Sequence, residues 1–331
     1  MNKSNLKILA GTTIALIAVL LALQFSSRDS TLNDDGLLFQ DLRDRINDVT
    51  TLTITRAGDA GVTVIHRTAD NWVIASRDNY PVDIARIRQL LLQIAAAKMV
   101  EQKTSDPDLY SQLGVQDPAI EGSKGTRIQV SGPDVSYDLI VGNVAQPGYR
   151  YVRKFEVSRS WLIDKDPGIP GSPAEWLVRD IIDIKSADVR SVTIRHPDGE
   201  EIRMSKDSAD APEFAVVNIP DGRELSYATV ANGIGGALNA LTLDDVRKGV
   251  AIETDAVSTT YETFAGNRIV VLTNEEDGES WIALTVAPGD DADTDAASLN
   301  ERVQGWQFRI ADYKANQLTR RWEDILKAET E

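Results

Sequence analysis

Two stretches of this chain, about 140 residues apart, show the same order of predicted strands and helices. Val49–Arg56 and Val189–His196 both alternate apolar and polar residues and are rich in β-branched side chains, the pattern of a half-buried strand. A glycine-containing turn follows each, and a second alternating run follows each turn, at Val62–Arg67 and Glu201–Ser205. Because self-similarity at a fixed spacing indicates one structural unit used twice, this feature limits the possible folds most strongly.

After these two strands, each half has a third strand, a helix, two more strands and the end of a short closing helix. In the first half these are expected at Trp72–Ala75, Ile84–Val100, Gly125–Val130, Tyr137–Val141 and Asp180–Ile182. In the second half they are expected at Glu213–Val217, Ala228–Leu241, Gly266–Val271, Trp281–Val286 and Asp324–Leu326. The sequence therefore predicts the α+β class, with two similar α+β repeat units at residues 45–183 and 184–327. Each unit would contain an antiparallel sheet with packed helices.

An uncharged apolar run of eighteen residues, Ile8–Phe25, precedes the two halves. As a helix it would be roughly 27 Å long, close to the hydrocarbon thickness of a bilayer. Lys3 and Lys7 lie before it, so the positive-inside rule leaves residues 1–7 in the cytoplasm and the bulk of the chain outside. A cleaved signal peptide is the alternative, but Ala22–Ser27 lacks the pair of small residues that cleavage needs. We therefore expect a retained transmembrane anchor.

The segment between the anchor and the first unit, residues 26–44, is predicted to be a juxtamembrane linker. Leu38, Leu42 and Ile46 recur at helical spacing, which predicts a short helix over Leu37–Asn47. The formal net charge is −16, and it becomes −18 without the two N-terminal lysines. So acidic a chain repels the phosphates of nucleic acids, and with no cysteine it has no disulfide, thiolate or Cys-based metal chemistry.

An ordered series of motifs runs along the first half. It consists of Trp72, Tyr80–Asp83, Asp108–Tyr110, Leu113–Val115, Pro118, Tyr137–Gly142 and Trp176–Asp180. This series resembles the bacterial family catalogued as Domain of Unknown Function 4340. In the second half no Leu-Gly-x-x-x-Pro element follows the expected helix, so the resemblance there is weaker. From the residues alone, we expect Gly114 to need a positive φ and Gly142 to end a strand.

The resemblance implies no activity and no catalytic residue. It implies a setting, because members of the family look like membrane-anchored companions of ABC-type transport systems of the gliding-motility kind. The expected localisation is therefore the bacterial inner membrane, with a single pass, a cytoplasmic N-terminus and the bulk of the chain in the periplasm. The expected partners are membrane proteins of an envelope complex, with ABC-type transporter subunits as the first candidates.

The residues that usually carry catalysis or bind cofactors form no recognised pattern. The two histidines, His66 and His196, lie in or at the end of predicted strands, with no serine nucleophile motif nearby. Asp291, Asp293 and Asp295 match the first ligands of a calcium-binding loop, but the required glycine and final glutamate are missing. Asn232–Gly236 lacks the glycine spacing of a dinucleotide site, and we expect close helix packing there instead. The sequence predicts no catalytic, cofactor or metal residues.

Two tryptophans remain as candidates for a binding groove. Most tryptophans of the chain are expected to be core residues, but Trp161 and Trp306 could line a groove for a partner or a carbohydrate. The leading interpretation is a non-enzymatic, membrane-anchored periplasmic module that is an accessory subunit of an ABC-type transport or envelope assembly complex. An envelope hydrolase that cleaves glycan through paired carboxylates is the alternative, and a ligand-binding sensor is a third.

Overall fold

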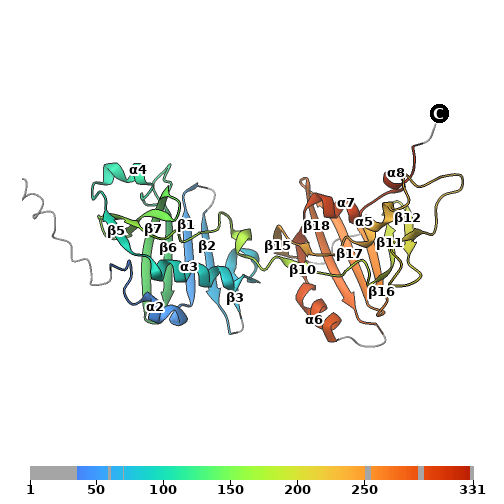
Figure 1. The fold of residues 1–331 in the computed structure, drawn as a ribbon, viewed down its shortest axis with the longest axis horizontal. Helices are drawn as coiled ribbons and strands as arrows, with labels where there is room; N and C mark the ends of the chain where they lie inside the picture. Colours follow the sequence, from blue (N-terminus) through green and yellow to red (C-terminus); the bar gives the residue numbers. More distant parts are fainter. Residues whose placement is uncertain (1–35, 59–60, 70, 250–254, 290–293, 329–331) are drawn as a thin grey trace, which may run out of the picture.

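The fold is known from a computed structural model, which describes residues 36–58, 61–69, 71–249, 255–289 and 294–328. These residues form a mixed α+β structure, in which mostly antiparallel strands make two large sheets and several short helices cover them. Figure 1 shows the two sheets side by side along the long axis of the molecule, in N-terminal to C-terminal order. The described residues also contain a two-stranded ladder.

The first sheet has nine strands. In spatial order they are β4 (Tyr80–Pro81), β3 (Trp72–Ile74), β2 (Val62–Arg67), β1 (Thr51–Arg56), β6 (Thr126–Gly132), β7 (Val135–Gln146), β8 (Tyr149–Lys154), β9 (Ser160–Ile163) and β5 (Met99–Gln102). The helices of this half are α2 (Leu42–Arg45), α3 (Ile84–Ala96) and α4 (Tyr110–Leu113). In Figure 1, α3 crosses one face of the sheet.

The second sheet has eight strands. In spatial order they are β13 (Ala215–Val216), β12 (Glu201–Ser205), β11 (Val189–Arg195), β16 (Val257–Thr263), β17 (Arg268–Glu276), β18 (Glu279–Ala287), β19 (Trp306–Arg309) and β15 (Asp245–Lys248). The helices of this half are α5 (Val230–Gly235), α6 (Thr294–Val303), α7 (Asp312–Leu318) and α8 (Trp322–Ile325). The small ladder pairs β10 (Asp180–Ile182) with β14 (Leu241–Thr242).

Both large sheets follow one strand plan. In the first sheet, the hairpin β1–β2 lies next to the later strand β6, and the far edge is β5, which comes earlier in the chain. In the second sheet, the hairpin β11–β12 lies next to β16, and the far edge is β15. The alignment of Gly125–Val130 with Gly266–Val271 was therefore wrong, because β6 occupies the place of β16 and β7 that of β17. A constant offset fails because α4 lengthens the connection before β6 and α6 lengthens the one before β19.

The helix α3 is shorter than expected. Asp83 caps its N-terminus by accepting a hydrogen bond from the Ala85 backbone N–H, and its buried face includes Ile87, Leu91 and Ile94. The expected continuation to Val100 is wrong, because the chain becomes extended at Ala97 and Met99–Gln102 forms the edge strand β5 against β9. The pairing partner lies more than fifty residues further along the chain.

Three other helix predictions need correction. The expected helix at Ala228–Leu241 is reduced to α5, and Leu241, the last residue of the expected helix, lies in strand β14. The expected closing helix at Asp180–Ile182 is instead strand β10, because β14 of the other half pairs with it. The expected helix over Leu37–Asn47 is reduced to α2 and a following 3-10 turn at Ile46–Asp48.

The predicted transmembrane anchor at residues 8–25 lies outside the described residues. So do residues 1–7 and the first part of the linker, up to residue 35. Within the described part of the chain, no helix combines the length and the apolar character needed to cross a membrane.

One buried apolar cluster contains residues of both halves, so the two halves are in contact through their cores. Tyr80, at the edge of the first sheet, is 4% exposed, and its ring makes edge-on contacts with Trp306 and Phe308 of the second sheet. The ring centroids lie 4.9 and 6.2 Å from that of Tyr80. Next to it, the Arg77 guanidinium donates two hydrogen bonds to the carboxylate of Asp245. We call this set of contacts the junction.

Candidate functional site

An apolar recess opens in the second sheet where β19 stops pairing with β18. The last paired residues are Ile282 and Phe308, and beyond them the chain at Gly305 and Trp306 separates from β18. A cavity of about 320 Å³ lies in this gap, lined mainly by apolar groups. Its lining residues on the two central strands are Val270, Leu272, Ala283, Leu284 and Thr285, and Gly249, Gln304, Gly305 and Trp306 complete it. We call this cavity the Trp306 recess.

The Trp306 recess lies beside the junction because one tryptophan belongs to both. The ring of Trp306 contacts Tyr80, and the ammonium group of Lys248 lies 5.6 Å from its centroid. Burial raises the pKa of Tyr80 to about 12, so its hydroxyl stays neutral at physiological pH. The recess can therefore accept an apolar side chain next to a rigid, uncharged aromatic contact.

Trp161, the other tryptophan proposed from the sequence, lies in the first sheet. It is in β9, where it is paired with Val152 and Gln102, and it packs partly buried against the core. Trp161 and Trp306 occupy corresponding strands, β9 and β19, but in different sheets, so they do not border one groove. Tyr80 was missed by the groove prediction, because only the packing of the two halves reveals its contact with Trp306.

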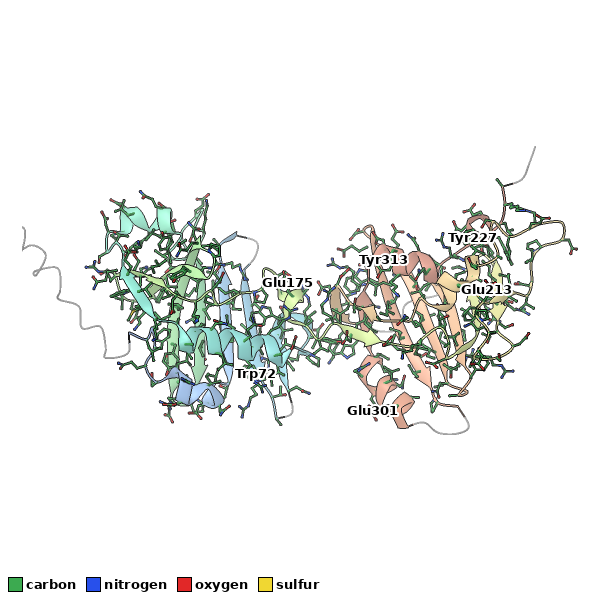
Figure 2. The ribbon with its side chains drawn as sticks, in the orientation of Figure 1. Trp72, Glu175, Glu213, Tyr227, Glu301 and Tyr313 are labelled. Carbon is green, nitrogen blue, oxygen red and sulfur yellow. The ribbon has the colours of Figure 1, made fainter. Side chains whose placement is uncertain are left out.

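A larger cavity, of about 630 Å³, lies between the end of the first half and the second sheet. Four carboxylates from both halves line it: Glu175, Asp244, Glu279 and Asp312. Figure 2 shows Glu175 where the two halves meet. The guanidinium of Arg179 donates to Asp244 at 2.8 Å, and Arg309 pairs with Glu279.

One of these carboxylates, that of Asp244, connects the two halves. Arg179 comes from the first half and Asp244 from the second, and Arg179 also donates to the carbonyl oxygen of Leu243. Elsewhere in the second half, hydrogen bonds lower the pKa of two carboxyl groups. The backbone N–H of Glu200 and the guanidinium of Arg321 lower the pKa of Asp198, and the guanidinium of Arg247 lowers the pKa of Glu276.

The histidines occupy the strand positions that the sequence indicated. His66 lies in β2, between Thr51 of β1 and Val73 of β3. His196 is buried just after β11, and its Nε2 lies 3.1 Å from the carbonyl oxygen of Arg320. That contact joins the end of β11 to the segment that follows α7, which supports a structural role for His196.

The glycine-rich stretch at Asn232–Gly236 packs against an aromatic ring. A Cβ atom on Gly235 would lie 2.1 Å from the ring of Phe214, so only glycine fits there. The close packing expected from the sequence is confirmed. In the acidic loop, Asp290–Asp293 lies outside the described residues, and the described residues contain no group of three His, Asp or Glu side chains that could hold a metal ion.

Two of the first-half motifs, Leu113–Val115 and the end of Tyr137–Gly142, meet on the first sheet. Gly114 has a φ of +68° at the C-terminus of α4, as expected for a left-handed cap. Gly142 lies inside β7 and does not end it, which corrects the sequence prediction. The reason is close approach, because a Cβ atom on Gly142 would lie 2.3 Å from the carbonyl oxygen of Leu113.

These features define a mixed α+β protein with two large antiparallel sheets joined at a buried junction. The chain belongs to the family described as Domain of unknown function (DUF4340), which matches residues 72–277. The match begins at β3 in the first sheet and ends just after β17 in the second, so it covers part of each sheet. No curated protein and no solved structure matches the chain.

Proposed function

We propose that this protein is a non-enzymatic, membrane-anchored periplasmic module, an accessory subunit of an ABC-type transport or envelope assembly complex. The anchor is the apolar run at residues 8–25, and the exported part is a pair of similar α+β repeat units at 45–183 and 184–327. The partners are membrane proteins of the same complex. The surface that receives them is the Trp306 recess.

The observation that carries this proposal is the apolar recess beside a rigid junction. Solvent-exposed apolar cavities in a strongly acidic protein have few structural roles, and they are common where partner side chains insert. Trp306 is a suitable anchor point, because aromatic residues at the centre of an interface contribute much of its binding energy. The contact with Tyr80 fixes its ring before binding, which lowers the ordering cost of association.

The test is a charge placed in the recess. Ala283→Arg puts a long cation between Leu272 and the rim of the recess, where an inserted apolar side chain would have to displace it. We expect affinity capture of the full-length chain in mild detergent to lose its membrane partner, with recovery reduced at least about tenfold. Mass spectrometry would identify the partner and circular dichroism would check the fold.

Val217→Arg is the matched control. Val217 is also apolar, lies just after β13 at the opposite edge of the same sheet, and is 64% exposed. This variant should capture the same partner as the wild type. If the wild-type chain captures no ABC-type or other integral membrane protein, or if Ala283→Arg captures it equally well, the proposal is wrong.

The anchor has its own test. A chain that begins at Ser30 with an exported leader is expected to fold, because the described structure begins after residue 35. It should nevertheless fail to complement a deletion strain, since a soluble module is not held at the membrane at high local concentration. Full complementation by this soluble chain would show that tethering is not part of the function.

A further inference from the structure

A third cavity lies in the second half, on the side of the sheet that α7 covers. It has a volume of about 490 Å³, within the range of small-molecule sites. It is surrounded by the beginning of β16, the C-terminal part of β17, the beginning of β18 and one side of α7. It shares only Ser280 with the cavity between the halves and no lining residue with the Trp306 recess.

One oxygen atom beside this cavity has no hydrogen-bond partner in the described structure. It is Oγ1 of Thr273, a buried atom on a side chain that is 4% exposed. Oδ1 of Asn274 also has no partner, but strand alternation places that side chain on the opposite face of β17. Folded proteins pair nearly all buried polar groups. The Thr273 hydroxyl therefore indicates a partner that the described residues do not supply.

The strand alternation directs Thr273 towards the cavity. Ile269, Val271 and Thr273 share one face of β17, and the first two are fully buried. On that side α7 contacts the strand, and its residues Ala315 and Asn316 line the cavity opposite Thr273. The Thr273 hydroxyl thus lies between the sheet and a polar space.

The first sheet has no such hydroxyl at the corresponding position. Thr273 of β17 is paired with Val257, the first residue of β16. In the first sheet, Val141 of β7 is paired with Thr126, the first residue of β6, and Val141 is 3% exposed. Valine and threonine have nearly the same shape, so the sheet does not need a hydroxyl at this place for packing. The second half carries a polar atom where an apolar one fits.

We propose that this cavity is a binding site for a small neutral saccharide. The hydroxyl groups of such a ligand supply both donors and acceptors for the Thr273 hydroxyl. The charges of the cavity favour a neutral molecule over an anion. Arg321 is already paired with Asp198 and Glu200, whereas Asp255 and Glu275 leave the mouth of the cavity acidic.

The experiment uses the full-length chain in detergent and three probes: N-acetylglucosamine, glucose and, as an anionic arm, glucose 6-phosphate. Saturation-transfer difference NMR detects contact, and titration calorimetry measures affinity. We expect at least one neutral probe to bind and glucose 6-phosphate to bind at least about tenfold more weakly. Thr273→Val should weaken the neutral probe about tenfold, because it removes one buried hydrogen-bonding group.

Two further variants separate binding from folding. Thr259→Val is the matched control: Thr259 is fully buried in the neighbouring strand, but its hydroxyl donates to the carbonyl oxygen of Leu318. Thr259→Val should lower the melting temperature and retain binding, whereas Thr273→Val should maintain or raise the melting temperature and lose binding. Asn316→Ala, at an exposed position on α7, should weaken the probe about fivefold without affecting the fold.

Three results would overturn the site. The first is that neither neutral probe contacts the wild-type chain. The second is that Thr273→Val binds the probe as well as the wild type does. The third is that only glucose 6-phosphate binds, which would mean that the ligand class is wrong.

Discussion

A Gly142→Ala variant is expected to lose about 3 kcal/mol of unfolding free energy, although it adds only one methyl group. The new Cβ atom would lie 2.3 Å from the carbonyl oxygen of Leu113 and 3.0 Å from the carbonyl carbon of Gly114. Both are backbone atoms, so no side chain can rotate away. The loop would have to lift off β7 and break the hydrogen bond from the Asn143 side-chain amide to the carbonyl oxygen of Gln112.

The measurement is urea unfolding followed by circular dichroism, with Gly233→Ala as the control. Gly233 lies in α5 with a negative φ, and its nearest atom to an added Cβ is Nε2 of Gln317, at an ordinary 3.7 Å. Alanine should therefore be neutral or stabilising there by up to about 1 kcal/mol, from helix propensity. A Gly142→Ala midpoint equal to that of the wild type would mean that the loop is not held against the strand.

A Tyr80→Ala variant is expected to uncouple the two halves. Deleting a buried aromatic side chain costs about 3–5 kcal/mol, and here the cavity would open between the sheets, where Tyr80 contacts Trp306 and Phe308. Other contacts between the halves remain in this variant, among them the Arg77–Asp245 pair, the hydrogen bonds from Arg179 to Asp244 and Leu243, and the β10–β14 ladder. Calorimetry should change from one cooperative transition to two.

Tyr227→Ala controls for the loss of a tyrosine as such. Tyr227 is 61% exposed, and Figure 2 shows it in the second half, near the C-terminal end of the fold and away from the junction. It should unfold like the wild type. Hydrogen exchange gives a second readout, because Tyr80→Ala should speed exchange in β15 and β19 and leave β1 unchanged. A single transition with unchanged exchange in those strands would show that the junction does not couple the halves.

Local patterning predicted the strands whose side chains alternate between core and solvent. The bounds of β2 and β12 agree with the expected Val62–Arg67 and Glu201–Ser205. The edge strands were missed, because β5 and β10 owe their extended form to distant partners and have too few residues to show a period. Met99 and Val100, the first two residues of β5, were therefore assigned to the end of a helix, since apolar residues precede them at helical spacing.

The candidate sites were predictable only in part. Trp306 could be selected as a candidate, but its partner Tyr80 becomes visible only when the two sheets meet. For the proposed saccharide site, the alternation of Ile269, Val271 and Thr273 in the sequence indicates that Thr273 shares the face of two apolar residues. The buried state of its hydroxyl depends on α7, which follows about forty residues later.

The closing strands of both sheets set the order in which this chain can fold as it is synthesised. In the first sheet, β5 ends at Gln102 and can pair only after β9, which starts at Ser160, has been synthesised. In the second sheet, β15 ends at Lys248 and can pair only after β19, which starts at Trp306, has been synthesised. The delay is 58 residues in each half. During that interval a strand edge is unprotected, and exposed edges recruit wrong partners. The first half can finish before the second half has emerged, which keeps two similar sheets from exchanging strands.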